Sequence, residues 1–298
     1  MAKSVWTAPD LSGKVAVVTG ASRGVGRGIA AVLGECGATV YVAARSSGTS
    51  AAADGAGGTI EETAELVTSR GGRGIPVRCD ASKLDDLEAL FERVKKGRKG
   101  LDVLVNNAWG GYEGHPRGLP MAHYWKTPFE TMWRGMFEAG LRAHMAAAHV
   151  AIPLMLKRPG GLIAGTVAWD HDQYLGGHYD VSKHAIVRFL HGLSRELKQF
   201  DIAAIAVAPG FTRTGRVLDA VGVTEEHAHN VPMLARTETP EYTGRAIASL
   251  AGDSKRMRKT GQAFLTGDLA RVYGFTDIDG RRIPPFRLKR SFEQLLKS

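Results

Sequence analysis

The chain has 298 residues, 44% hydrophobic and 23% charged, so it can bury a large core and is too apolar to be disordered. Its formal net charge of +9 comes from scattered Lys and Arg residues without zinc-finger spacing or interleaved aromatic residues, which argues against nucleic-acid binding. No apolar run approaches the ~20 residues of a membrane span, and neither a secretion signal nor a disulfide framework is evident, so we expect a cytoplasmic protein.

Short β-branched runs alternate with stretches of helical length along the chain. We predict strands at residues 15–19, 39–43, 75–79, 101–105, 161–168, 202–207 and 263–265. We predict helices at residues 26–34, 60–69, 84–96, 129–156, 179–199 and 241–251, and a surface loop of small residues at 46–58. The first strands are almost continuously apolar, as parallel strands covered on both faces are. This order therefore predicts an α/β fold in which helices flank a doubly wound parallel sheet.

A glycine-rich turn with the sequence TGASRGVG, residues 19–26, joins the first predicted strand to the first predicted helix. Glycine is needed where the chain turns tightly and where backbone approaches a pyrophosphate, and the helix N-terminus offers N–H groups to phosphates. Since no Gly-Lys-Ser/Thr follows, a Walker-type site is excluded. The turn predicts a Rossmann-type dinucleotide site. Its candidate cofactor-binding residues are Gly20, Ser22, Arg23, Gly24, Val25 and Gly26.

The end of the second predicted strand selects between the two nicotinamide dinucleotides. NAD sites usually carry an acid there, which hydrogen-bonds the ribose 2′-hydroxyl. This sequence has Arg45 instead, with Arg23 in the glycine turn as a second cation. A guanidinium suits a 2′-phosphate, which a carboxylate would repel. We therefore expect NADP(H) to be preferred over NAD(H).

Tyr179 and Lys183 open the helix that follows the fifth predicted strand, one turn apart on one face. A free phenol has a pKa near ~10, too high for ready proton exchange at neutral pH. A nearby lysine ammonium stabilises the phenolate and lowers that pKa. The pair predicts catalysis in which Tyr179 is the acid/base and Lys183 assists it.

In this order the motifs resemble the short-chain dehydrogenase/reductase family, from Lys14 to about Gly267. Further matches are Asp80 after the third strand, Asn106-Asn107-Ala108 after the fourth, and residues 209–214 (PGFTRT) after the sixth. Residues 139–144 (AGLRAH) resemble in particular the branch that contains dehydrogenase/reductase family member 1.

The resemblance assigns roles to these positions. It implies that Asp80 and Ala81 lie near the adenine and that Asn107 and Ala108 lie along the cofactor. It implies that Lys183 binds the nicotinamide ribose. The residues that it places beside the nicotinamide are Pro209, Gly210, Thr212 and Thr214.

Two positions depart from the family pattern. A serine near the end of the fifth strand usually hydrogen-bonds the substrate oxygen, but counting forward from Gly161 finds Ala168 there. Counting back from Tyr179 finds Thr166, and the following loop offers other polar groups. These groups are Asp170, His171 and Tyr174. At Gly140 the family's helix usually carries the asparagine that holds a water for the proton relay. A missing oxyanion donor can cost on the order of 100- to 1000-fold in rate.

Aromatic residues surround the predicted site and are expected to line an apolar pocket. They are Trp109, Tyr112, Tyr124, Trp125, Phe129, Trp133, Trp169 and Phe211, although core packing is the preferred interpretation for Trp133 on its helix. The ten histidines show no ligand spacing with cysteine or acidic neighbours, so no metal site is expected.

We expect one NAD(P)-binding domain over residues 1–298, with extensions at 1–12 and 268–298 and a substrate lid at 212–236. The leading function is reversible reduction of a carbonyl, or oxidation of an alcohol, on an apolar small molecule. The alternative is a catalytically weak NADPH-binding sensor or scaffold, which Ala168 and Gly140 suggest. Alanine-rich helices resembling the family's interface predict a homodimer or homotetramer.

Overall fold

The computed structural model describes residues 6–48, 57–98, 100–112, 124–126, 128–169 and 176–287. In these residues seven parallel strands form one sheet in the order β3-β2-β1-β4-β5-β6-β7. The strands are β1 Val15–Thr19, β2 Thr39–Ala44, β3 Arg73–Arg78, β4 Val103–Asn106, β5 Leu162–Thr166, β6 Ala203–Ala208 and β7 Ala263–Leu265. The chain order reverses between β1 and β4, which is where such sheets bind ligands. The doubly wound Rossmann-type fold expected from the sequence is thus confirmed.

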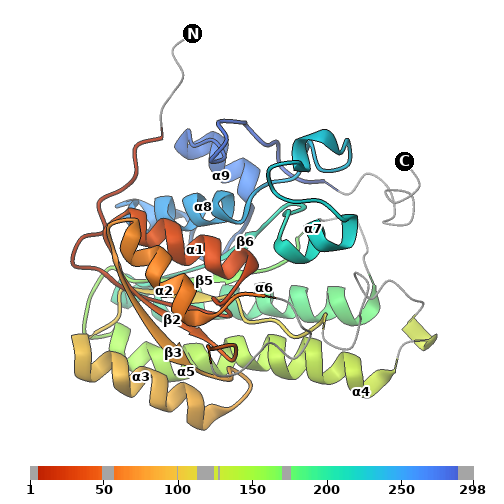
Figure 1. Ribbon diagram of the computed structural model, residues 1–298. Coiled ribbons are helices and arrows are strands. Elements are labelled where there is room, and N and C mark those ends of the chain that lie inside the picture. Colours follow the sequence, from red (N-terminus) through yellow and green to blue (C-terminus); the bar gives the residue numbers. More distant parts are fainter. Residues whose placement is uncertain are drawn as a thin grey trace.

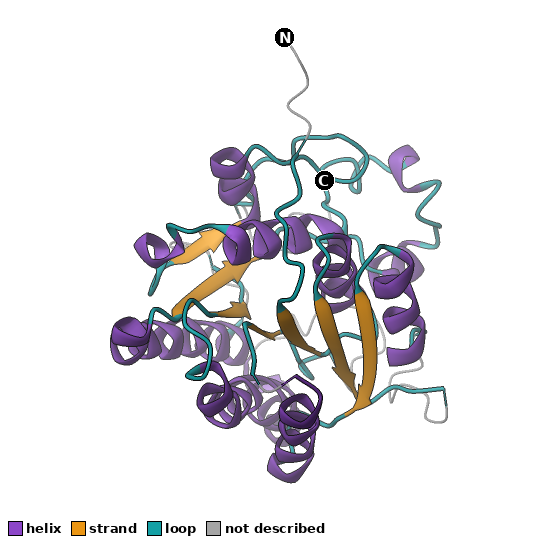
Figure 2. Cartoon of the chain, turned by 90° about the vertical axis from the view of Figure 1, so that its left-hand side faces the viewer, coloured by secondary structure: helices purple, strands orange, loops and turns teal. Residues whose placement is uncertain are grey.

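Helices cover both faces of the twisted sheet (Figures 1 and 2). One face packs on α1 Gly24–Glu35, α2 Ile60–Ser69, α8 Pro240–Gly252 and α9 Thr266–Tyr273. The other packs on α3 Leu84–Arg98, α5 Ala143–Met155 and α6 Gly177–Leu197. Further short helical segments are η1 Tyr124–Lys126, η3 Lys198–Phe200, α7 Gly215–Val221, η4 Ala228–Asn230 and η5 Arg256–Lys259. None of the described helices is both long and apolar enough to cross a bilayer.

Most elements differ from their predicted bounds by one to three residues, and two differences bear on the site. β5 ends at Thr166, so Ala168 lies on the loop beyond the strand. The helix predicted at 129–156 is three segments, because α4 Phe129–Met132 and α5 flank a π-helix, η2 Trp133–Arg142. A Cβ on Gly135 in η2 would come within 2.6 Å of the Gly110 carbonyl oxygen. The wider π turn therefore forms where the loop after β4 packs directly on the helix backbone.

The segment 212–236, which contains α7 and η4, packs around its own small core of Leu218, Ala228 and Leu234. Arginines tie this segment to the C-terminal extension. Arg213 pairs with Asp279 at 3.0 Å, and Arg281 donates to the Ala235 carbonyl at 2.7 Å. The extension therefore supports the segment from outside the sheet (Figure 1).

Candidate active site

The predicted cofactor-binding and catalytic residues lie at the carboxyl edge of the sheet, because the seven described strands are parallel and their following loops meet there. Gly20 to Gly26 follow β1, Arg45 follows β2, and Asp80 with Ala81 follow β3. Asn107 and Ala108 follow β4, Pro209 to Thr214 follow β6, and Tyr179 with Lys183 begin α6. The sheet topology alone brings these segments of the chain to one edge.

The glycine turn forms a cradle that side chains would fill. Gly20 and Gly24 have φ of +64° and +54°, a region that favours glycine. A Cβ on Gly20 would come within 2.8 Å of the Ala108 Cα, and one on Gly26 within 2.5 Å of the Asn107 Nδ2. The N-cap of α1 is Arg23, whose guanidinium cannot accept hydrogen bonds from the first-turn amides. The bare turn and the helix N-terminus therefore fit a pyrophosphate.

Asn107 holds this cradle against the end of β4. Its Nδ2 donates to the carbonyl oxygens of Thr19 and Gly20, at 3.2 and 3.1 Å. Its backbone amide donates to the Thr19 hydroxyl at 3.0 Å. The Thr166 hydroxyl in turn donates to the Asn107 Oδ1 at 3.2 Å. Asn107 thus holds the turn by the Nδ2 of its side chain and the end of β5 by its Oδ1.

The Ala21 amide donates to the Ala43 carbonyl oxygen at 3.2 Å, which sets the glycine turn beside the end of β2. Arg45, which follows β2, is exposed, and Arg23, within the turn, is half-buried. Glu61 of α2 also reaches this edge, where its carboxylate accepts a hydrogen bond from the Gly48 amide at 3.0 Å.

On the loop after β3, the Asp80 carboxylate accepts hydrogen bonds from the amide and the hydroxyl of Ser82, at 3.1 and 2.7 Å.

The loop after β6 is anchored from behind by a buried carboxyl group. The Thr212 hydroxyl donates to Glu238 at 3.3 Å, and the Gly210 amide also donates to it. Burial raises the pKa of Glu238 to about 8. A Cβ on Gly24 would lie 3.4 Å from the Thr214 methyl group, so this loop closes over the phosphate cradle.

Tyr179 and Lys183 meet at an indole. The Nζ of Lys183 lies 3.5 Å from the centre of a Trp109 ring, and the Trp109 and Tyr179 rings meet edge to face with centroids 5.7 Å apart. Lys183 is buried, whereas Tyr179 is half-buried and hence accessible from the solvent side. A cation over a desolvated tryptophan ring is stabilised by about 2 kcal/mol.

The Tyr179 hydroxyl is hydrogen-bonded to the hydroxyl of Tyr112, on the loop after β4. Arg216 of α7 supports Tyr112 from the other side. Its guanidinium carbon lies 5.4 Å from the Tyr112 ring centre, and its Nη2 donates to the Tyr112 carbonyl oxygen at 3.2 Å. The two phenols therefore form one unit that spans the loop after β4 and the start of α6.

The pKa of Tyr179 shifts in the direction opposite to that expected from the sequence. Burial, followed by the nearby Tyr112, raises the pKa of Tyr179 well above its ordinary value. The expectation that Lys183 would lower it is wrong, because burial also depresses the pKa of Lys183, to about 7. At neutral pH Tyr179 is thus a protonated donor, and Lys183 is poised near its midpoint.

Trp109 accounts for the glycine at position 140. A Cβ on Gly140 would lie 2.7 Å from the indole Cζ3, and one on Gly111 would lie 2.7 Å from its Cε2. The indole is therefore packed between two residues without side chains. An asparagine at position 140 would compete with Trp109 for the same space.

His144 fastens the loop that carries Trp109. It is buried, and its Nε2 donates to the Ala108 carbonyl oxygen at 3.3 Å. The side-chain Nδ2 of Asn106 donates to the backbone carbonyl oxygen of His144 at 3.1 Å. Burial, followed by the charge of Lys183, lowers the pKa of His144 to about 3. The ring is hence neutral, and among the described residues its Nδ1 has no hydrogen-bond partner.

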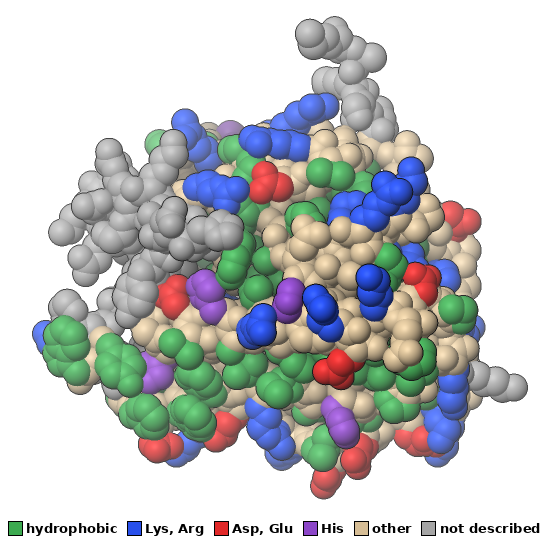
Figure 3. Space-filling view, turned by 180° about the vertical axis from the view of Figure 1, so that it is seen from behind, with side chains coloured by type: hydrophobic (Ala, Val, Ile, Leu, Met, Phe, Trp, Pro, Cys, Tyr) green, Lys and Arg blue, Asp and Glu red, His purple; other side chains and the backbone are tan. Residues whose placement is uncertain are grey.

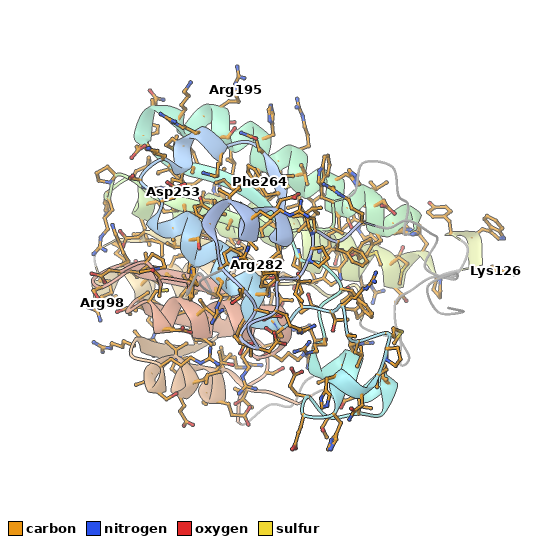
Figure 4. All side chains as sticks on the ribbon, turned by 90° about the horizontal axis from the view of Figure 1, so that it is seen from above. Arg98, Lys126, Arg195, Asp253, Phe264 and Arg282 are labelled. Carbon is orange, nitrogen blue, oxygen red and sulfur yellow. The ribbon has the colours of Figure 1, made fainter. Side chains whose placement is uncertain are left out.

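Aromatic side chains gather at the end of the molecule formed by η1 and α4 (Figure 3). We name Tyr124, Trp125, Phe129 and Trp133 the aromatic patch; their exposed fractions range from 42% to 75%. The patch meets His178, which precedes Tyr179, through stacking with Tyr124 at 4.6 Å. The core interpretation preferred for Trp133 is therefore wrong. Lys126 marks how far η1 projects from the body (Figure 4).

The sequence did not single out the contacts that Trp109 and Tyr112 make. The sequence pattern predicts both only as aromatic residues that line a pocket, and His144 only as part of a motif. The available signal was the bulky Trp109 followed closely by Gly111, with Gly140 in a helix where a side chain was expected. Of the groups proposed to replace the usual serine, Asp170, His171 and Tyr174 lie outside the described residues.

Comparisons with known proteins agree with this geometry. The family model for short chain dehydrogenases matches residues 14–221. Dehydrogenase/reductase SDR family member 1 of Mus musculus is 33% identical over 93% of this chain and 87% of its own length. The 3-oxoacyl-(acyl-carrier-protein) reductase FabG of Vibrio harveyi is 27% identical over 89% and 98%. A short-chain type dehydrogenase/reductase structure from Mycobacterium marinum superposes with a TM-score of 0.68 at 26% identity, covering 86% of this chain and 94% of that one.

Proposed function

This chain belongs to the short-chain dehydrogenase family, whose members are NAD(P)-dependent oxidoreductases of carbonyl and alcohol groups, and from that premise we propose its specific activity. It prefers NADP(H) and interconverts a carbonyl and an alcohol on an apolar small molecule, with Tyr179 as acid/base and Lys183 as its assistant. The observation that carries the proposal is the pair itself. Half-buried Tyr179 and buried Lys183 stand one turn apart beside the glycine cradle.

A bound nicotinamide would supply the hydride in reduction and accept it in oxidation. In reduction the Tyr179 hydroxyl donates its proton to the substrate oxygen while the new C–H bond forms, so the carbonyl becomes an alcohol. In oxidation the Tyr179 phenolate takes that proton back. The raised pKa of Tyr179 favours the protonated form and therefore supports the reducing direction at neutral pH.

The surroundings of Tyr179 support an apolar substrate. The aromatic patch adjoins it through His178, and Trp109 forms the wall beside it. The segment 212–236 is proposed as the lid, since its Arg216 contacts Tyr112, the hydrogen-bond partner of Tyr179. Closure of such a segment would exclude water from the proton transfer.

NADPH should bind at least about tenfold more tightly than NADH, a difference of about 1.4 kcal/mol. Arg23 and Arg45 border the cradle where a 2′-phosphate would lie, while Glu61 on the same edge limits the gain. Arg45→Asp should erase or reverse the ratio, because a carboxylate repels the phosphate and suits a 2′-hydroxyl. Calorimetric titration of the unaltered chain and of Arg45→Asp with both cofactors measures the ratio of the two affinities.

The matched control is Arg195→Asp. Arg195 is also exposed, but it lies 16 residues beyond Tyr179 on α6, about 24 Å along the helix axis (Figure 4). The ratio of NADPH to NADH affinity in Arg195→Asp should stay at the wild-type value. Equal affinities of the unaltered chain for the two cofactors would refute the assignment.

Cofactor affinity should also depend on pH through Lys183. Its pKa of about 7 is depressed by burial, and a bound anionic dinucleotide would stabilise the ammonium and raise that pKa. Below pH 7 Lys183 is already charged, so affinity is flat there. Above pH 7 binding must take up a proton, and the Kd should rise by up to about tenfold per pH unit.

This slope is measured by titrating NADPH between pH 7 and 9, above the titration of the 2′-phosphate near ~6. Calorimetry in two buffers of different ionisation enthalpy reports the proton uptake directly. Lys183→Met should flatten the curve, whereas Lys126→Met, on exposed η1, should leave it unchanged (Figure 4). A wild-type curve as flat as that of Lys183→Met would remove Lys183 from the cofactor site.

We further propose that the chain forms a homodimer or homotetramer, through the family-type interface of α5 and α6. Met145 on α5 and Val181 on α6 are exposed in the single chain, at 45% and 59%, as residues of such an interface would be. Light scattering at micromolar concentration tests this assembly. The cytoplasmic location stays a prediction from the sequence.

A further inference from the structure

Neither candidate for the position of the family's serine offers a free hydroxyl donor in this chain. Ala168 carries a methyl group on the loop after β5, and the nearest hydroxyl on that strand, Thr166, is already committed. Its single proton goes to the Asn107 Oδ1 at 3.2 Å, which holds the glycine cradle. Thr166 is also buried, so a substrate bound at the half-buried Tyr179 would not displace that bond without opening the cradle.

Tyr112 places a hydroxyl where a second donor is needed. It is hydrogen-bonded to the Tyr179 hydroxyl, so the two oxygens already lie within reach of one common acceptor. Tyr112 is half-buried, as Tyr179 is, and lies on the loop after β4. Its ring lies beneath Arg216 of α7, which fixes its orientation.

We infer that Tyr112 is the second catalytic hydroxyl, which donates a hydrogen bond to the substrate oxygen beside Tyr179 in place of the usual serine. The inference rests on the proposed function of Tyr179. A carbonyl oxygen has two lone pairs, so it can accept from both phenols once they release each other. In reduction the hydride bonds to carbon and the Tyr179 proton moves to oxygen. Tyr112 keeps its proton and stabilises the negative charge that develops on that oxygen.

The electrostatics of the pair suit this division of labour. Burial raises the pKa of Tyr112, so it stays a neutral donor at neutral pH, while the nearby Arg216 acts in the opposite direction. The hydrogen bond with Tyr112 contributes to the raised pKa of Tyr179. Removing the Tyr112 hydroxyl should therefore both remove an oxyanion donor and lower the pKa of Tyr179.

Tyr112→Phe tests the inference, since phenylalanine preserves the ring and removes only the oxygen. Turnover with NADPH and a reactive carbonyl such as an aromatic 1,2-diketone should fall by about 10- to 1000-fold, with NADPH affinity unchanged. The alkaline limb of the reduction profile should move to lower pH, which a merely structural loss would not cause. In the Tyr112→Phe background, Ala168→Ser should recover part of the turnover because it supplies a hydroxyl from the other side.

The matched control is Tyr273→Phe. The Tyr273 hydroxyl is also hydrogen-bonded, to Asp253 at 2.6 Å, at the end of the molecule away from Lys126 (Figure 4). The role of Tyr112 would be overturned by two results together. Tyr112→Phe would turn over as fast as Tyr273→Phe, and Ala168→Ser would bring no gain in the Tyr112→Phe background. If Tyr179→Phe were silent as well, the proposed function itself would fail, so the two failures are distinguishable.

Discussion

Tyr179→Phe should lose about a thousandfold or more in carbonyl turnover and keep its NADPH affinity within about twofold. A positioned general acid contributes about 100- to 10,000-fold, and no described group beside Tyr179 combines its partial exposure with the adjacent lysine. The ring stays in place because its edge-to-face contact with Trp109 needs no hydroxyl. Stopped-flow oxidation of NADPH with a carbonyl panel measures the loss.

The raised pKa of Tyr179 also predicts the direction in which the reduction and oxidation rates change with pH. The pKa of Tyr179 is raised, so the protonated form required for reduction persists through the neutral range. The phenolate required for oxidation is scarce there. As long as the pH stays below that pKa, the phenolate fraction rises tenfold with each unit of pH increase. Oxidation should therefore rise steeply with pH while reduction stays flat. In Tyr179→Phe the residual rates should lose both trends.

A different result would change the assignment of function. If the unaltered chain binds NADPH but reduces no member of the panel, the sensor or scaffold alternative is favoured. If turnover is real but Tyr179→Phe retains it, another acid operates. Mass spectrometry of ligands that co-purify with the chain would then guide the choice of substrate.

The sequence predicted the fold because the relevant signals are local. The apolar strands 15–19 and 39–43 predict burial on both faces, and the glycine turn requires a strand before it and a helix after it. Tyr179 and Lys183 are one helical turn apart, so their proximity also follows from the sequence alone. The segments that carry chemistry then meet at one edge because parallel strands share a carboxyl edge.

Contacts between loops and helices were not predictable in this way. Trp109 packs against Gly140, 31 residues later, and no periodicity marks that contact. Tyr112 lies on a loop whose path depends on the same packing. The pKa of Tyr179 was predicted in the wrong direction because the sequence shows the neighbouring charge of Lys183 but not the burial of both groups. The burial of Tyr179 raises its pKa, and the charge of Lys183 cannot offset this because burial also disfavours the charged form of Lys183.

Gly140→Asn should lower the free energy of unfolding by about 1–3 kcal/mol, the usual effect of overpacking a filled site. The new Cβ would lie 2.7 and 2.9 Å from the Cζ3 and Cε3 atoms of Trp109, and the amide would extend further into the ring. Since the indole is held between Gly140 and Gly111, it cannot move aside without leaving Lys183. Urea denaturation measures the loss.

A double-mutant cycle identifies the cause. Trp109→Ala removes the clash, so the double variant should be about as stable as Trp109→Ala alone, with a coupling of about 1–3 kcal/mol. Gly192→Asn is the matched control, because Gly192 is also a helical glycine but a Cβ there meets nothing within 4 Å. It should be neutral or slightly stabilising, as asparagine has the higher helix propensity. Additive losses in the cycle would mean that Trp109 does not occupy the space of the missing asparagine.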